Sequence, residues 1–111
     1  MNANQYKESL KESWDKYSLE EQLANIGAEV GRSSKWQNKD QKLFEGAKYR
    51  ALELFDLTMG DSRWKGHLKE IALVRELFCE ASEKGKIYET TLKDLERYFI
   101  PFMVISRKLA A

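Results

Sequence analysis

Two charged side chains on one short stretch of the chain have the types and spacing for acid–base chemistry. Arg63 and His67 lie four residues apart in RWKGH, so a helix would place both on one face. An arginine can stabilise developing negative charge and a histidine can transfer a proton, as cleavage of RNA requires. The pattern raises a degenerate ribonuclease as a hypothesis, while a lone exposed histidine is the simpler interpretation.

Other catalytic and metal-binding patterns are missing from the sequence. The arginine–histidine motif of the HEPN ribonucleases has a longer gap, so that motif is not met. Glu76, Glu80 and Glu83 have helical spacing, but His67 is the only histidine, so the Glu-x-x-His pairs of di-iron proteins cannot form. Cys79 is the only cysteine, which excludes an intramolecular disulfide and a cysteine zinc cluster. We expect a protein that is not an enzyme and has no metal and no cofactor.

A basic stretch lies between residues 32 and 50. It holds six Lys or Arg and two Asp or Glu, a net charge of +4, whereas the whole chain has a net charge of +1. Such a stretch could neutralise phosphates, and its tryptophan could stack on a base. The candidate nucleic-acid-binding residues are Arg32, Lys35, Trp36, Lys39, Lys42 and Lys48. The alternative is a solvated face with the tryptophan packed against a neighbouring helix.

Hydrophobic spacing predicts four long helices that would position these side chains. Apolar or small residues recur at intervals of three and four, which is typical of one helical stripe. The stripes cover residues 19–33, 43–58, 64–81 and 92–109. With 111 residues, the chain is expected to form a single domain over residues 1–111. We predict an all-α, up-down-up-down four-helix bundle with residues 1–17 as a short N-terminal helical extension.

Local signals sharpen this expectation. Ser18 and Glu21 have the spacing of a capping box at the start of the first long helix. Gly27 and Gly31 lie on one side of that helix and predict the close approach of another helix. Pro101 lies inside the last stripe and removes one backbone donor, so a kink is predicted near Arg97 to Pro101.

The last predicted helix is apolar almost all round. Its sequence RYFIPFMVIS offers more apolar surface than one core can cover, and a helix apolar on every side is normally buried on every side. We expect a homo-oligomer or a protein partner to cover the remainder, with Phe99, Phe102 and Met103 at the interface. A protein–protein adaptor that binds no nucleic acid is therefore the alternative to a nucleic-acid-binding protein.

The sequence has no sign of a membrane segment or secretory leader. No apolar run approaches the roughly 18 residues of a membrane span. The N-terminal residues lack the apolar core of a signal peptide. We expect a cytoplasmic protein that does not associate with membranes.

One stretch of the chain carries a family resemblance. The residues that carry it are Ala24, Asn25, Ile26, Ala28, Glu29, Gly31, Arg32, Ser34 and Lys35, followed by Ala47, Lys48, Leu52 and Glu53. In this region, from about Gln22 to Leu57, the chain resembles the 23S rRNA intervening-sequence proteins, which include the accessory proteins of diversity-generating retroelements. Val30 stands where that family usually has a glycine.

The resemblance implies a four-helix bundle that assembles as a ring, typically a pentamer. In the accessory proteins the ring surface is basic and binds nucleic acid and a reverse transcriptase. Carried over to this sequence, Arg32, Lys35 and Lys48 are candidate contacts to RNA or DNA. The resemblance supplies no catalytic site.

Overall fold

The computed structural model describes residues 2–83 and 90–110, with the side chains of residues 109 and 110 left out. Every regular element in this part of the chain is a helix, which confirms the all-α class. The elements are α1 (Ala3–Asp15), α2 (Leu19–Trp36), α3 (Gln41–Met59), the 3₁₀ helix η1 (Ser62–His67), α4 (Leu68–Ser82) and α5 (Leu92–Ala110). The extension at residues 1–17 thus contains the short helix that the sequence predicts.

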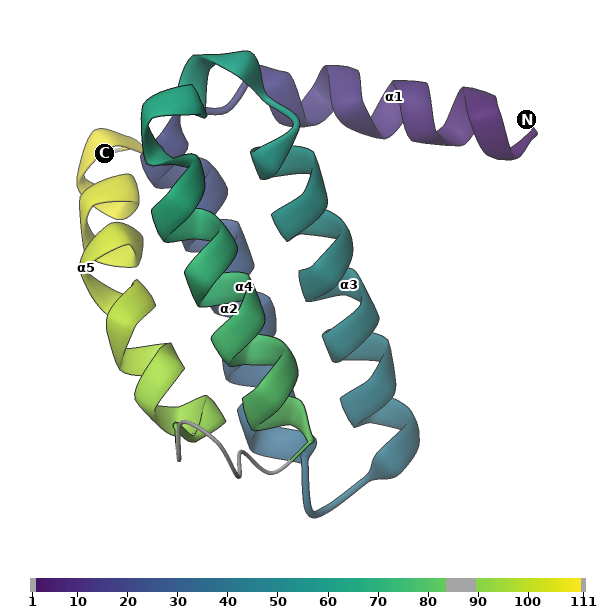
Figure 1. The fold of residues 1–111 in the computed structure, drawn as a ribbon, viewed down its shortest axis with the longest axis vertical. Helices are drawn as coiled ribbons and strands as arrows, with labels where there is room; N and C mark the ends of the chain where they lie inside the picture. The colour runs from purple at the N-terminus through teal and green to yellow at the C-terminus, as the bar shows by residue number, and fades with distance from the viewer. Residues whose placement is uncertain (1, 84–89, 111) are drawn as a thin grey trace.

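Helices α2, α3, α4 and α5 lie alongside one another, and α1 projects from one end of this helical body (Figure 1). Helix α2 has the most extensive contacts, with α5 on one side and α3 on the other. Helix α4 packs less extensively against α3 and α5, and α1 contacts mainly α3. The C-terminal half of α2 and the N-terminal half of α3 therefore meet at the end of the body opposite α1.

Side-chain caps explain where three of the helices begin. Ser18 accepts a hydrogen bond from the Glu21 amide, and the Glu21 carboxylate accepts one from the Ser18 amide, which confirms the predicted capping box. Asp40 caps α3, because its carboxylate accepts a hydrogen bond from the Leu43 amide. Thr91 and Asp94 form the same reciprocal pair at the start of α5, with aspartate in place of the usual glutamate.

The third hydrophobic stripe begins at Trp64, but the α-helix that contains it begins four residues later. Trp64 belongs to η1 and has non-helical backbone angles of φ −102° and ψ 18°, so α4 begins only at Leu68. One short-range and one long-range hydrogen bond stabilise this arrangement. Asp61 accepts from the Arg63 amide and caps η1, while the Trp64 indole donates to the buried Gln22 side chain at 3.0 Å.

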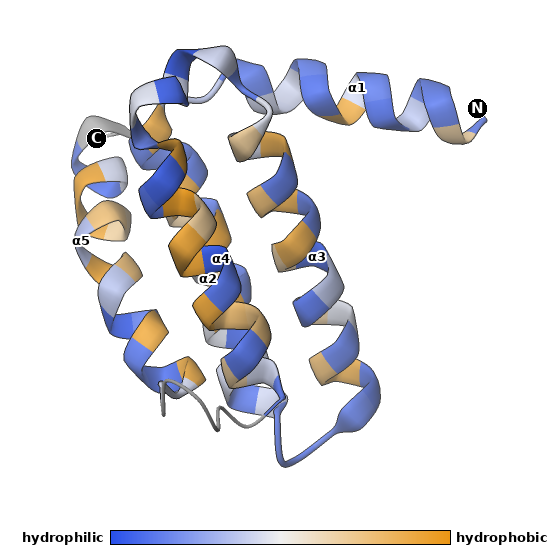
Figure 2. Cartoon of the chain, in the orientation of Figure 1, coloured by the Kyte–Doolittle hydropathy of each residue, from blue (hydrophilic) through white to orange (hydrophobic). Residues whose placement is uncertain are grey.

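The core lies between the four long helices, whose hydrophobic faces turn toward one another, whereas α1 is largely hydrophilic (Figure 2). Phe55, Phe78 and Phe99 from α3, α4 and α5 are fully buried at its centre. The ring centroid of Phe55 lies 5.8 Å from that of Phe78 and 6.2 Å from that of Phe99. Helix α2 adds Ile26 and Val30, which are also fully buried. One contiguous core therefore joins all four helices.

A buried polar network closes the end of the body nearest α1. Gln22 is fully buried, and its amide nitrogen donates to the Trp14 carbonyl at 3.0 Å and to Asp61 at 3.3 Å. The Trp14 indole donates to the Thr58 hydroxyl at 2.9 Å. Since Trp14 is the only buried residue in α1, these bonds hold the C-terminal end of the projecting helix against α2 and α3.

The predicted close approach of two helices occurs at Gly27. A Cβ atom built on Gly27 would lie 2.5 Å from the Cβ of Phe99, and one on Gly31 would lie 3.2 Å from the Glu96 carboxylate. The α2–α5 contact therefore depends on a missing side chain. Helix α5 continues through Pro101 as one element and curves along the body (Figure 1). Proline has no amide hydrogen to donate within the helix, which favours such a bend.

Candidate nucleic-acid interface

The predicted basic residues gather around two hollows on either side of the C-terminal half of α2. The first, here called the α2–α3 hollow, has a volume of about 280 Å³. Its lining consists of Glu29, Arg32, Trp36, Lys42, Leu43, Gly46, Ala47 and Arg50. The second, the α2–α5 hollow, has a volume of about 440 Å³. Its lining consists of Gly31, Ser34, Lys35, Asn38, Lys39, Lys93 and Glu96.

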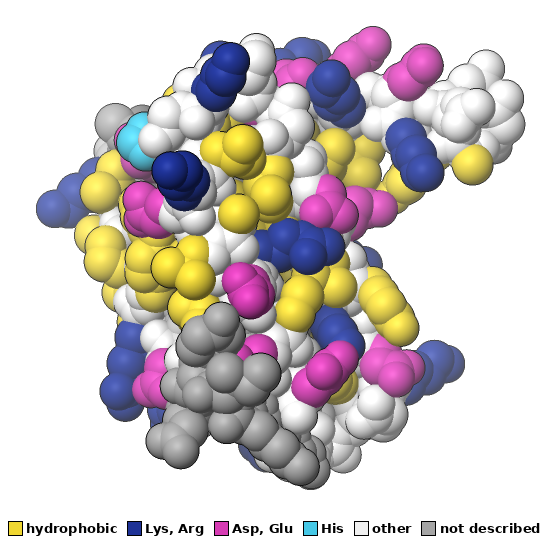
Figure 3. All heavy atoms as spheres, in the orientation of Figure 1, with side chains coloured by type: hydrophobic (Ala, Val, Ile, Leu, Met, Phe, Trp, Pro, Cys, Tyr) yellow, Lys and Arg dark blue, Asp and Glu magenta, His cyan; other side chains and the backbone are white. Residues whose placement is uncertain are grey.

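Each hollow carries an excess of positive charge. Three cationic side chains and one carboxylate line each of them, so each lining has a net charge of +2. The face shown in Figure 3, which includes α4, is different, because Lys and Arg there are interspersed with Asp and Glu and with hydrophobic side chains. Positive charge therefore concentrates along the C-terminal half of α2, which is the basis for an anion-binding surface.

Five of the six predicted residues line one or the other of the two hollows. Arg32, Trp36 and Lys42 line the α2–α3 hollow, and Lys35 and Lys39 line the α2–α5 hollow. Lys48 lines neither hollow. Two further cations complete the linings, Arg50 in the first hollow and Lys93 in the second. Sequence reasoning missed Lys93 because it lies on α5, far along the chain from the basic stretch.

Trp36 both packs against a neighbouring helix and lines a hollow, the two roles that the sequence leaves open. Its side chain is half-buried and packs against the hydrophobic core, so part of the ring is an anchor between helices. The same residue lines the α2–α3 hollow. The Nζ atom of Lys35 lies 4.9 Å from the ring centroid, a cation–π distance that holds one positive charge over the ring.

A buried carboxylate lies at the α2–α3 hollow. Glu29 is only 6% exposed, and its Oε1 atom accepts from Arg32 at 2.6 Å and lies 3.7 Å from Arg50. Both arginine side chains are more than half exposed. Glu29 thus anchors the inner ends of two flexible cations, whose remaining donors stay available at the rim.

Arg63, which the sequence pairs with His67 for RNA cleavage, has other partners in the structure. Arg63 binds both carboxylate oxygens of Asp61, with contacts of 2.6–3.1 Å, and donates to the Tyr17 carbonyl at 2.9 Å. The hydrogen bonds from Arg63 lower the pKa of Asp61 from its usual 3.8 to about 2. The Asp61 carboxylate in turn raises the pKa of Arg63. Arg63 therefore holds the connection after α3 in place, while His67 is exposed at the end of η1.

His67 does line a small hollow with other polar groups, between α2, α4 and α5. The hollow has a volume of about 270 Å³ and also includes Glu70, Ile71, Tyr98 and Phe102. The Tyr98 hydroxyl donates to Glu70 at 2.6 Å. Burial, together with this carboxylate, raises the pKa of Tyr98 beyond its ordinary range, so the phenol keeps its proton and acts as a structural donor.

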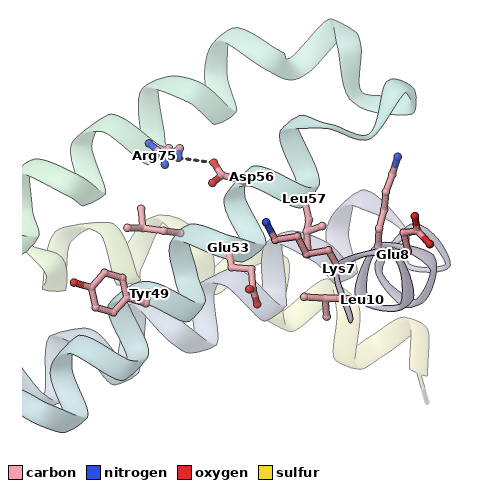
Figure 4. Close-up of a pocket in the computed structure, with 10 residues that line it drawn as sticks. Lys7, Glu8, Leu10, Tyr49, Glu53, Asp56, Leu57 and Arg75 are labelled. Carbon is pink, nitrogen blue, oxygen red and sulfur yellow. Dashed lines mark hydrogen bonds and ion pairs between the residues drawn. The ribbon is translucent and has the colours of Figure 1, made fainter. Parts of the chain in front are cut away.

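A larger groove lies in the corner between α1 and α3 (Figure 4). It has a volume of about 670 Å³ and an apolar floor that includes Leu10, Leu52 and Leu57. Three cations and three carboxylates surround this floor, so the groove has no net charge. One of these cations, Arg75, forms an ion pair with Asp56 at 2.9 Å. An anionic polymer has no electrostatic reason to prefer this groove.

The apolar surface of α5 differs from the predicted interface. Phe99 is fully buried in the core, and Phe102 and Met103 are half-buried. In this structure Phe99 cannot contact a partner, which corrects its placement at an interface. Among the described side chains of α5, the large apolar ones that are exposed include Ile100, Val104 and Ile105, at 49%, 44% and 43% exposure. A helix apolar all round gives no signal for which side faces the core, so the sequence could not separate these two faces.

Within the described parts of the chain, no group of three or more His, Cys, Asp and Glu side chains is placed to hold a metal ion. None of the helices described there has the length and apolar character needed to cross a lipid bilayer. Comparisons with protein-family models, curated proteins and solved structures find no match to this chain.

Proposed function

We propose that this chain is a non-enzymatic accessory protein that binds nucleic acid along the C-terminal half of α2. The observation that carries the proposal is the pair of hollows flanking this half-helix, each with three cationic side chains and a net charge of +2. The two hollows lie on opposite sides of one helix, so a strand crossing α2 would pass from one to the other.

Binding would be driven mainly by neutralising phosphates and releasing counterions. Six cations line the two hollows, so up to six phosphate contacts are available. For a single strand, the logarithm of the association constant would then fall against the logarithm of salt concentration with a slope of up to about −4. Trp36 adds an aromatic surface within the first hollow for an unpaired base.

The proposal includes the architecture and the family resemblance. We read α2–α5 as an up-down-up-down four-helix bundle, and the side-by-side placement of these helices supports that reading (Figure 1). The resemblance to intervening-sequence proteins adds the expectation of a ring assembly with a basic surface. Arg32 and Lys35, two residues that carry the resemblance, line the two hollows, which supports the proposed surface.

A double substitution with a matched control tests this function. Lys35→Gln with Lys39→Gln removes two cations from the α2–α5 hollow, whereas Lys65→Gln with Lys69→Gln makes the same charge change at the other end of the body. Anisotropy of a labelled single-stranded RNA would be measured over a range of salt concentrations. The first pair should flatten the salt slope by about 1.4 units, and the control pair should leave it near the wild-type value. Equal effects of both pairs, or no binding at low salt, would refute the proposed surface.

The exposed strip on α5 favours a second candidate, a protein-interaction role. Ile100, Val104 and Ile105 present apolar surface that water does not stabilise. If a second copy or a protein partner covers this strip, Val104→Glu should lower the mass of the assembly in solution while leaving the helical content unchanged. Light scattering would measure this mass. A wild-type protein that is monomeric at all concentrations would remove the self-association form of this candidate.

A further inference from the structure

Helix α1 carries an apolar stripe that its own chain covers only at one end. Tyr6, Leu10 and Trp14 follow one another at intervals of four, so they lie on one face of the helix. Trp14 is buried in the body, Leu10 is half-buried and Tyr6 is 54% exposed. Most of the stability of a short helix in a protein comes from packing of its apolar face. A surface that covers Tyr6 and Leu10 would therefore stabilise the projecting helix.

The groove in the corner between α1 and α3 adjoins this stripe, because Leu10 also lines it. Figure 3 shows the surface hollowed beneath the projecting helix, and Figure 4 shows the lining side chains in the corner. The volume of about 670 Å³ exceeds that of either basic hollow. On the α3 side, the Tyr49 side chain adds apolar surface at 64% exposure. A helix with an apolar face suits such a corner.

The two walls of the groove carry opposite charge. Lys7, Glu8 and Lys11 line the α1 wall, which has a net charge of +1. Glu53 and Asp56 line the α3 wall, and with Arg75 of α4 this side has a net charge of −1. Among the described residues, the ion pair between Arg75 and Asp56 is the only one formed by these six side chains. The two lysines and Glu53 thus remain without a partner of opposite charge.

This charge pattern limits the occupant of the groove. A strongly acidic or strongly basic partner would be repelled by one of the two walls. A purely apolar partner would remove Lys7, Lys11 and Glu53 from water without pairing them, which is unfavourable. A second copy of this chain meets both conditions, because a twofold axis places the α1 wall of each copy against the α3 wall of the other.

We propose that two copies of this chain form a twofold dimer in which α1 of each lies in the groove of the other. Lys7 and Lys11 then face the partner's Glu53, and Tyr6 and Leu10 pack against the partner's α3. The inference is independent of the proposed nucleic-acid function, because none of the groove residues lines either basic hollow. It also differs from association through the apolar strip of α5, which contributes no residue to this groove.

A charge-swap experiment tests the reciprocal pairing. One variant carries Lys7→Glu with Lys11→Glu, and the other carries Glu53→Lys; all three positions are exposed, so the fold should be retained. Alone, each variant places like charges at both copies of the contact and should dimerise at least about tenfold more weakly than the wild type. In an equimolar mixture, one contact is the wild-type pair and the other is the same pair with its charges exchanged. The mixture should therefore recover a dimer.

Sedimentation velocity over a range of protein concentrations measures the mass, and circular dichroism checks the helical content. A wild type that remains monomeric throughout would overturn the proposal. Dimerisation of either variant alone as tight as that of the wild type would also overturn it. Weak dimerisation of both variants without recovery in the mixture would show that the two walls do not pair with each other.

Hydrogen exchange and a variant of the α5 strip locate the interface independently. Exchange of the α1 amides should slow as the wild-type protein passes from monomer to dimer, because the dimer covers this helix. Val104→Glu, on the exposed face of α5, should leave the dimer intact. A dimer that Val104→Glu dissociates, with exchange in α1 unchanged by concentration, would place the interface on α5 and refute the α1 contact.

Discussion

Substitution of Gly27 by alanine tests the close contact between α2 and α5 on which the whole body depends. The new Cβ atom would lie 2.5 Å from the Cβ and 3.1 Å from the Cγ of Phe99, and 3.4 Å from the sulfur of Met103. The Cβ of Phe99 is attached directly to the α5 backbone, so rotation of the ring cannot move it away. The two helices must therefore separate, and the fully buried Phe99 loses part of its packing.

Gly46 provides the matched control for the size of the effect. Alanine is favoured over glycine inside a helix by about 1 kcal/mol, and this gain applies at both positions. At Gly46 nothing lies within 4 Å of the new Cβ, so Gly46→Ala should stabilise the protein by about 0.5–1 kcal/mol. At Gly27 overpacking costs about 1–3 kcal/mol and the loosened helix contact adds to it, so the net result is a destabilisation of about 1–2 kcal/mol.

Urea and thermal unfolding, followed by circular dichroism, measure both variants against the wild type. The free energies of unfolding of the two variants should differ by about 1.5–3 kcal/mol, which corresponds to about 6–20 °C in midpoint temperature for a chain of this size. The comparison cancels helix propensity, because both substitutions change glycine to alanine inside a helix. If Gly27→Ala stabilises the protein as much as Gly46→Ala does, the close α2–α5 approach is refuted.

Two further substitutions address the polar network and its dependence on pH. Thr58→Val removes the acceptor of the Trp14 indole and leaves a buried donor unpaired. It should therefore lower the free energy of unfolding by about 1–3 kcal/mol and speed hydrogen exchange in α1. Unchanged exchange would show that this bond does not hold α1. Asp61 has a folded-state pKa of about 2, below its unfolded value of 3.8, so its contribution is complete above about pH 4 and is lost as the pH falls toward 2. Between about pH 4 and pH 2 the free energy of unfolding of the wild type should fall by up to about 2 kcal/mol more than that of Asp61→Asn. If the free energies of unfolding of the two proteins change with pH in parallel, Asp61 does not have a lowered pKa.

The local parts of the fold could be predicted because short-range rules determine them. The capping residues Ser18 and Glu21 act within one turn of helix, and their spacing alone identifies them. The close approach at Gly27 follows from the absence of a side chain on a helix face that otherwise carries apolar residues. In both cases the information lies within a few neighbouring residues, so no knowledge of the partner helix is required.

The features that could not be predicted depend on contacts between distant segments. Trp64 fits a helical stripe by spacing, yet its indole bonds to Gln22, 42 residues away, and the backbone around it becomes a 3₁₀ helix. Lys93 joins the basic surface only because α5 packs beside α2. Lys48 lines neither hollow although it lies in the same basic stretch, a result that counting charges along the chain does not reveal.

Glu29 shows why the sign of a charge is a poor guide to its role at such a surface. Taken from the sequence alone, an acidic residue beside a basic stretch weakens the case for nucleic-acid binding. In the structure it is buried, it accepts from Arg32 and lies near Arg50, within a lining of net charge +2. A surface of cations alone attracts any phosphate chain equally, since backbone contacts carry no sequence information. Glu29 instead determines where two of those cations lie, because it accepts from Arg32 at 2.6 Å and its Oε1 atom lies 3.7 Å from Arg50, so the residue that counts against binding in a charge tally is one that positions the basic surface.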